Sequence, residues 1–123
     1  MTDRSARAKG SLMRIYKILR AGEWSDLERL GETQGAPVDV ADGFIHFSTA
    51  DQVAETAARH FADEDGLILA AFDAEALGPA LKWETSRGGA LFPHLYAPLR
   101  RADVVWHAPL PLREGAHVFP EEL

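Results

Sequence analysis

The chain has 123 residues with 13 basic and 19 acidic side chains, which gives a formal net charge of −6, and it has no cysteine. One domain holds roughly 100 to 200 residues, so this length excludes an enzyme with separate cofactor and substrate domains. The acidic balance argues against nucleic acid or an anionic membrane as a partner, because such partners are bound through Lys and Arg. The absence of cysteine excludes disulfides, thiolate nucleophiles and thiolate-bound zinc.

The distribution of hydrophobic residues indicates whether the protein crosses a membrane or carries a signal peptide. Hydrophobic residues make up 46% of the chain, as in soluble globular domains. The longest apolar run, 67–72, is much shorter than the roughly 20 residues of a membrane-spanning helix. Residues 1–11 are small and polar, and no apolar segment typical of a signal peptide follows them. We therefore expect a cytoplasmic protein with a disordered tail over 1–11 and one globular domain over 12–123.

Hydrophobic spacing predicts the elements of the N-terminal half. Trp24, Leu27 and Leu30 recur every three residues among charged side chains, which is typical of an amphipathic helix. Thr49 and Gln52 form a capping-box pattern that predicts the start of a second helix. In chain order we expect a strand over 13–19, a helix over 21–30, a loop over 32–42, a strand over 43–48, and a helix between Thr49 and the turn at 63–66.

The C-terminal half predicts mainly strands. The apolar run 67–72 is typical of a central strand that is buried on both faces. The elements expected around it are a helical turn over 73–79, a strand over 81–86, a flexible connection over 87–90, strands over 94–98 and 103–107, and an extended segment from residue 109. Short turns favour antiparallel pairing. The predicted fold is thus an α+β single compact domain, with a mixed, mostly antiparallel sheet of about five or six strands and two helices near the N-terminus.

The first candidate site lies on the predicted strand 43–48. Residues two apart on a strand share a face, so an imidazole and a hydroxyl, His46 and Ser48, lie side by side where a capped helix begins. Free backbone N–H groups at the helix start would help to bind a polar ligand. Alternatively, His46 is a hydrogen-bonded core residue and Ser48 belongs to the cap.

Two further polar sets lie on later strands. Glu84 shares a strand face with Lys82 and Ser86, and its carboxylate could act as a base or stabilise positive charge. His94 and Tyr96 share a face after a Gly-rich loop, and they could hydrogen-bond a ligand or stack on it. The alternatives are a solvated charged face and a surface cluster.

A metal site is considered and not expected. His46, His94 and Glu84 would match two-His, one-carboxylate ligation, but the sequence has no close spacing such as His-x-His or His-Glu-x-x-His to support it. The chain also lacks a P-loop, a Gly-x-Gly-x-x-Gly turn and a Gly-x-Ser-x-Gly elbow. Kinase, Rossmann and α/β-hydrolase functions are therefore excluded.

Four short motifs in a fixed order resemble a known family. They are Ile15-Tyr16-Lys17-Ile18, Asp42-Gly43-Phe44-Ile45-His46-Phe47-Ser48, Trp83-Glu84 and Phe92-Pro93-His94-Leu95-Tyr96. With them the sequence resembles the family catalogued as domain of unknown function 952, over roughly residues 13–110. That family has no established activity.

A more distant similarity is to the ADP-ribosyltransferase-like fold, in which a split sheet holds NAD and an early strand carries His followed two residues later by Ser or Thr. His46 and Ser48 match that motif. The similarity implies that His46 hydrogen-bonds the nicotinamide ribose and that Ser48 assists at the nicotinamide. Glu84 would stabilise a positively charged ribose carbon, although in the usual order the catalytic Glu comes last.

This resemblance implies NAD or a related nucleotide as the substrate and requires no metal. The residues expected to take part are His46 and Glu84 in catalysis, and Ser48, Trp83, Phe92, His94 and Tyr96 in ligand binding. Three hypotheses remain: an NAD- or nucleotide-utilising enzyme, a non-catalytic nucleotide-binding module, and a structural or interaction protein. The enzyme hypothesis fails if Glu84 and His46 lie on opposite faces of the sheet.

Overall fold

The computed structural model describes residues 13–123, apart from the side chain of Arg87. The predicted disordered tail over 1–11 lies outside the described residues. Every strand pair within the described range is antiparallel, and the α-helices lie in its N-terminal half. The predicted α+β single-domain fold is therefore confirmed.

The elements follow one another with short connections. The strands are β1 (Arg14–Leu19), β2 (Glu32–Thr33), β3 (Ile45–His46), β4 (Ser48–Thr49), β5 (Leu67–Asp73), β6 (Leu81–Thr85), β7 (Leu91–Leu95), β8 (Leu99–Arg100), β9 (Val104–Leu110), β10 (Leu112–Arg113) and β11 (Ala116–His117). The α-helices are α1 (Ala21–Leu30), α2 (Pro37–Asp42) and α3 (Val53–His60). Short 3₁₀ segments cover Glu75–Ala80, Arg87–Gly89 and Arg101–Asp103.

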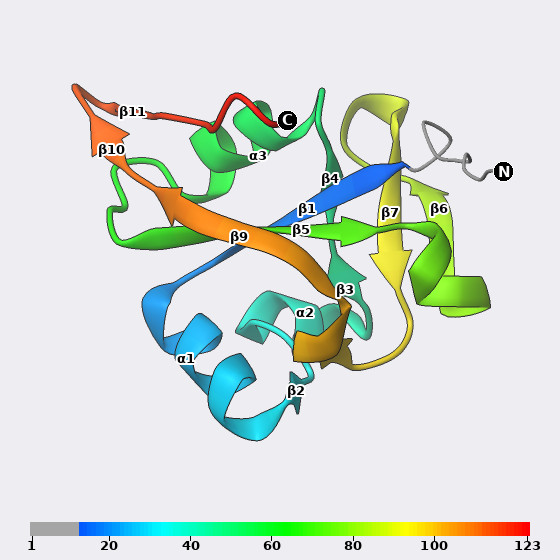
Figure 1. Cartoon of the computed structure of the whole chain (residues 1–123). Helices are drawn as coiled ribbons and strands as arrows, with labels where there is room; N and C mark the ends of the chain where they lie inside the picture. Colours follow the sequence, from blue (N-terminus) through cyan, green and yellow to red (C-terminus); the bar gives the residue numbers. More distant parts are fainter. Residues whose placement is uncertain (1–12) are drawn as a thin grey trace, which may run out of the picture.

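Two sheets form the framework of the site (Figure 1). The larger sheet has the strand order β4-β1-β5-β9, and the smaller has the order β3-β7-β6. Two-stranded pairs β2-β8 and β10-β11 complete the pairing. In Figure 1, β1, β5 and β9 run across the molecule, with α3 above them and α1 and α2 below. This arrangement leaves the smaller sheet at one end of the larger one.

The hydrophobic core lies on both faces of the larger sheet, so β5 is buried on both faces, as predicted for the apolar run 67–72. One cluster packs α1 and the smaller sheet against the larger one; its members include Ile15, Leu19, Leu27, Ile45, Phe47, Phe72 and Leu95. The other cluster packs α3 against the opposite face; its members include Tyr16, Ile18, Val53, Ala57, Leu69 and Leu110. Burial of these apolar side chains fixes the sheets relative to each other.

The predicted strand over 43–48 is wrong in one respect that matters for the site. β3 pairs with β7 in the smaller sheet, whereas β4 pairs with β1 in the larger sheet. The chain crosses between the sheets at Phe47, whose N–H donates to Pro93 O at 3.1 Å and whose ring packs edge-on against Phe72. Since β4 pairs with β1 only at Ile15 and Tyr16, no strand in the described chain covers that edge of β1 from Lys17 onward.

The predicted loop over 32–42 instead contains β2 and helix α2. Pro37 occupies the first turn of α2, where a missing N–H costs no hydrogen bond. The Asp39 carboxylate accepts the Ala36 N–H at 2.7 Å and so caps the helix. Gly43, with φ of 86°, ends it in the left-handed conformation. Helix formation here depends on the capping carboxylate more than on apolar periodicity, which the stretch lacks.

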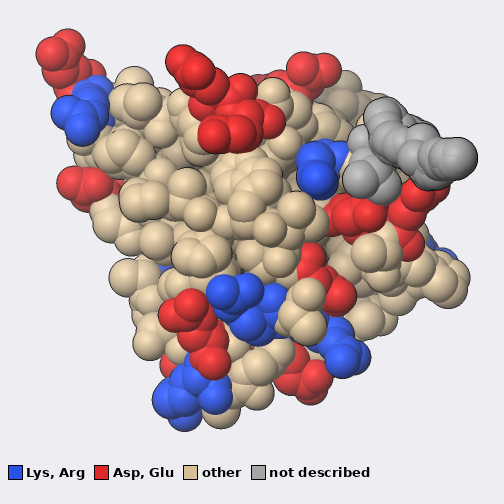
Figure 2. Space-filling view, viewed as in Figure 1, with Lys and Arg blue, Asp and Glu red and all other residues tan. Residues whose placement is uncertain are grey.

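Other boundaries differ in smaller ways. α3 begins at Val53, because the Thr49 N–H donates to Gln52 Oε1 at 3.0 Å in a turn that precedes the helix. β7 begins and ends earlier than the predicted 94–98 strand, and β9 continues to Leu110. Over residues 13–123, no helix is both long and apolar enough to cross a bilayer. The face in Figure 2 shows acidic and basic side chains interspersed, with no continuous basic patch.

Candidate functional site

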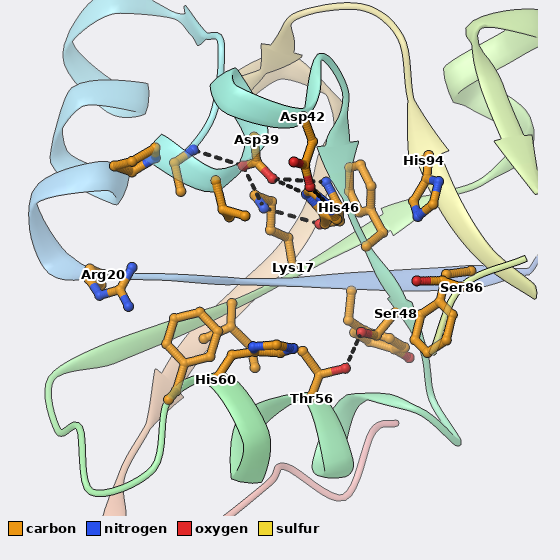
Figure 3. Close-up of a pocket in the computed structure, with 18 residues that line it drawn as sticks. Lys17, Arg20, Asp39, Asp42, His46, Ser48, Thr56, His60, Ser86 and His94 are labelled. Carbon is orange, nitrogen blue, oxygen red and sulfur yellow. Dashed lines mark hydrogen bonds and ion pairs between the residues drawn. The ribbon is translucent and has the colours of Figure 1, made fainter. Parts of the chain in front are cut away.

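A cavity of about 840 Å³ lies where the two sheets separate. It is bounded by β1, by α2 on one side and by α3 on the other (Figure 3). The residues that line it are Tyr16, Lys17, Ile18, Arg20, Ala36, Pro37, Val38, Asp39, Asp42, His46, Phe47, Ser48, Thr56, His60, Phe61, Ser86, Phe92 and His94. This volume falls within the roughly 300–1,000 Å³ of small-molecule sites, and apolar walls with a few polar groups are typical of them.

Asp39 is the centre of a buried polar network at this cavity. Its side chain is fully buried and forms an ion pair with Lys17 Nζ at 3.0 Å. It also accepts hydrogen bonds from the backbone N–H of Ala36 at 2.7 Å and of His46 at 3.1 Å. Lys17 Nζ in turn donates to the backbone carbonyl of His46 at 3.0 Å. The network fixes α2 to β1 and β3, and so holds the shape of one cavity wall.

The ionisation of Asp39 follows from these contacts. Burial alone would raise the pKa of this carboxyl group, because it disfavours the charged form. The hydrogen bonds from His46 and the positive charge of Lys17 outweigh burial and lower the pKa from 3.8 to about 2. Asp39 is therefore ionised at neutral pH and is committed to Lys17 and His46.

His46 lies between two carboxylates. Its Nδ1 is 2.6 Å from Asp39 Oδ1 and its Nε2 is 2.9 Å from Asp42 Oδ2. An ionised carboxylate only accepts, so the Nδ1–H of His46 donates to Asp39. In the protonated imidazole both ring nitrogens donate, and both carboxylates are then satisfied at once. Asp42 is the more exposed partner, so a ligand can reach His46 Nε2 by displacing it.

Hydroxyl groups form the α3 side of the cavity. Ser48 Oγ lies 2.9 Å from Thr56 Oγ1 (Figure 3), and Thr56 donates to the Gln52 carbonyl at 3.2 Å. At the far end, the guanidinium of Arg20 lies 4.8 Å from the ring centre of Phe61. Arg20 is also paired with Glu64, and this hydrogen bond is the main reason that its pKa is raised.

A third set of hydrogen-bonded polar side chains consists of Glu84, His94 and Tyr96. His94 Nδ1 is 2.7 Å from Glu84 Oε1, and the Tyr96 hydroxyl donates to the same oxygen at 2.8 Å. The hydrogen bond from His94 and then that from Tyr96 lower the pKa of Glu84, and Glu84 raises the pKa of Tyr96 in return. The ring of Phe44 stacks on His94 with centres 4.1 Å apart, which further restricts the imidazole.

The structure brings together most of the predicted site residues. His46 and His94 are cross-strand partners, with ring centres 5.5 Å apart, and they line the cavity with Ser48 and Phe92. Glu84 lies on the same sheet face as His46, since Lys82 pairs with His94 and alternate residues share a face. His46 and Glu84 do not lie on opposite faces of the sheet, which is the arrangement that would have excluded the enzyme hypothesis.

Three predicted residues lie outside the cavity. Glu84 does not line it and reaches it only through His94. Trp83 pairs with Pro93 on the opposite face of the smaller sheet. Tyr96 lines a separate hollow of about 380 Å³, next to Phe44.

Sequence reasoning missed several residues that the cavity contains, above all Asp39, Lys17 and Thr56. Asp39 fell in a segment expected to be a loop, although Asp three residues after Ala36 and two after Pro37 is a helix-start signal. Lys17 lies between Ile15-Tyr16 and Ile18-Leu19 in a mostly apolar strand, and a buried Lys needs an acidic partner. Nothing in the spacing marks Thr56, since its contact with Ser48 depends on how α3 packs.

Within residues 13–123, no group of three or more His, Asp and Glu side chains is arranged to hold a metal ion. The polar groups of the cavity instead bond to one another and present imidazole, hydroxyl and carboxylate groups to a ligand. Such a set can bind a polar ligand and can transfer protons.

Comparison with known proteins identifies the family. The family described as "Protein of unknown function (DUF952)" matches residues 18–107. The chain belongs to this family. The X-ray structure of protein CC0527 from Caulobacter crescentus is similar, with a TM-score of 0.83 and 49% identity over 85% of this chain and 93% of that one. The solution NMR structure of CC0527 gives a TM-score of 0.76 and 49% identity over 85% and 90%. None of the curated proteins matches the chain significantly.

Proposed function

We propose that this protein binds a nucleotide of the NAD class in the cavity and acts on it at the ribose carbon that bears nicotinamide. The observation that carries the proposal is the convergence of His46, Ser48 and His94 on one cavity of about 840 Å³. These side chains come from three strands of two different sheets. A small split sheet with this early His and Ser is similar to the ADP-ribosyltransferase-like fold.

The walls of the cavity suit the parts of such a ligand. Tyr16, Phe61 and Phe92 offer aromatic rings to a base or a nicotinamide. Arg20 also lines the cavity and would bind a phosphate by exchanging its pairing with Glu64. The edge of β1 beyond Tyr16 has no partner strand in the described chain, so its backbone can pair with a carboxamide. His46 and Ser48 lie beside this edge.

The role that the resemblance implies for Glu84 changes in this proposal. A carboxylate that stabilises a positive ribose carbon must face that carbon, and Glu84 does not line the cavity. Asp42 does line it and is partly exposed. We assign the electrostatic role to Asp42 and leave Glu84 as the partner of His94.

A thermal-shift and NMR titration of the protein with NAD, ADP-ribose, nicotinamide and AMP tests the proposal. A ligand that binds only the folded state raises the melting temperature, and shifted NMR signals should map to His46, Ser48 and His94. The control is Val105→Ala on the exposed part of β9, which lines neither hollow. This variant should show the same thermal shift with each compound as the wild type. No response to any of the four compounds would refute nucleotide binding.

One observation favours a second candidate, a non-catalytic nucleotide-binding module. The buried carboxylate of Asp39 is already neutralised by Lys17, so it is not available to the reaction. Binding of NAD without any release of nicotinamide over hours would favour this module over the enzyme.

A further inference from the structure

The two histidines of the cavity are held in different ways, and this difference separates their roles. Both ring nitrogens of His46 face carboxylates, those of Asp39 and Asp42. His94 has a carboxylate at Nδ1 alone, that of Glu84, and in the described chain its Nε2 has no hydrogen-bond partner. The lone pair that a base needs is therefore available on His94 and not on His46.

Nε2 of His94 is also accessible. Among the described side chains of residues 13–123, one fully buried nitrogen or oxygen atom has no hydrogen-bond partner, and this atom is Arg14 Nη1. Nε2 of His94 has no hydrogen-bond partner among the described residues and is not one of these atoms, so it is not fully enclosed; His94 itself is one of the residues that line the cavity. Glu84 lies outside the cavity, and the two ring nitrogens, which flank Cε1, point in widely different directions. Because Nδ1 is held against Glu84, we infer that Nε2 faces the cavity.

The tautomer of His94 follows from its partner. An ionised carboxylate accepts and cannot donate, so Nδ1 carries the proton and Nε2 carries the lone pair in the neutral ring. Tyr96 donates to the same oxygen, Glu84 Oε1, at 2.8 Å and holds this carboxylate in place. Stacking of Phe44 on the ring, at 4.1 Å between centres, and a side-chain exposure of 6% keep His94 from turning over.

We propose that His94 is the general base of this site, that Glu84 is its positioning residue, and that the acceptor of the reaction is a hydroxyl group, from water or an alcohol. This assignment rests on the proposed function. The acceptor oxygen forms a bond to the ribose carbon as the bond from that carbon to nicotinamide breaks. The bonding pair leaves with the nicotinamide nitrogen, and the hydroxyl proton passes to Nε2 of His94 and then to solvent.

The choice of acceptor follows from the base. A carboxylate or thiolate acceptor is already ionised and gains nothing from a proton acceptor, whereas a hydroxyl group must lose its proton during attack. The arrangement of Tyr96, Glu84 and His94 resembles the orienting chains by which hydrolases activate a hydroxyl. Here the chain ends at a cavity, beside His46, instead of at a protein nucleophile.

Two measurements on the whole chain test this inference. Long-range ¹H–¹⁵N NMR correlation of the free protein should show His94 as the Nδ1–H tautomer, and Glu84→Ala should shift it toward Nε2–H, with Glu75→Ala as the exposed control. Nicotinamide release from NAD should fall about 10²- to 10⁴-fold in His94→Gln, while NAD still raises the melting temperature. His107→Gln, in β9 and outside the cavity, should keep the wild-type rate.

The outcomes separate the two proposals. NAD binding together with an Nε2–H tautomer in the wild type, or with an unchanged rate in His94→Gln, would overturn the role of His94 and leave nucleotide binding intact. A wild-type protein that does not bind NAD would overturn the proposed function, and it would refute the proposed transfer step as well. The full set of expected results supports both.

Discussion

Replacement of Asp39 by Asn tests the buried network from which the cavity is built. Asp39 accepts two backbone N–H groups, the Nδ1–H of His46 and the ammonium of Lys17, and its side chain is fully buried. Asn keeps the shape but places a neutral group, half of it a donor, among these donors. Lys17 then becomes a buried cation without an anion, which typically costs about 3–5 kcal/mol of unfolding free energy.

The pH dependence gives the sharper test. The pKa of Asp39 is lowered from 3.8 to about 2, and each pKa unit is worth about 1.36 kcal/mol, so ionisation contributes about 2 kcal/mol. Because the pKa in the folded state lies below the unfolded value, this stability is fully present above about pH 5. It is lost as the pH falls through about 2.

Urea unfolding of the wild type and of Asp39→Asn between pH 6 and pH 2 measures this contribution. The gap between the two unfolding free energies should be about 3–5 kcal/mol at pH 6 and should narrow by about 2 kcal/mol at pH 2. Asp51→Asn, an exposed site, should stay within about 0.5 kcal/mol of the wild type. A gap that stays constant with pH would show that Asp39 is not an ionised partner of Lys17 and His46.

Four further substitutions test the fold and the site. His46→Ala should abolish the thermal shift with NAD while a cooperative melting transition remains; loss of that transition would instead make His46 a structural residue. Gly35→Ala should destabilise the protein by more than about 1 kcal/mol, because φ is 96° and the new methyl group would meet the Asp39 carboxylate. Gly22→Ala has open space in α1 and should stabilise the protein by about 0.5–1 kcal/mol. Equal urea midpoints for these two variants would contradict both expectations. Phe72→Ala, in the fully buried core, should cost about 3–5 kcal/mol, and a smaller loss would mean that Phe47 and its neighbours collapse into the space.

The elements that could be predicted from sequence are those whose apolar spacing repeats. α1, with Trp24 and Leu27 buried on one face, has its predicted bounds, and β5 is the predicted central strand. α2 could not be found in this way, because its first turn is stabilised by the Asp39 carboxylate and not by an apolar stripe. The break between β3 and β4 was missed for a related reason. Alternation from Phe44 to Ser48 is the same whether the strand stays in one sheet or moves to another at Phe47.

The candidate site shows the same limit at the level of single side chains. Strand periodicity places His46, Ser48, Glu84 and His94 on faces, but it does not say how far along a strand a cavity extends. Glu84 therefore seemed equivalent to His46 as a catalytic group, whereas the register places it beyond the cavity rim, where it contacts His94. A carboxylate outside the cavity cannot stabilise a bound ligand directly, yet it can fix which nitrogen of the His94 imidazole carries the proton. Strand periodicity could thus indicate the residue types of the proposed site, whereas the contact by which Glu84 holds His94 follows only from the three-dimensional structure.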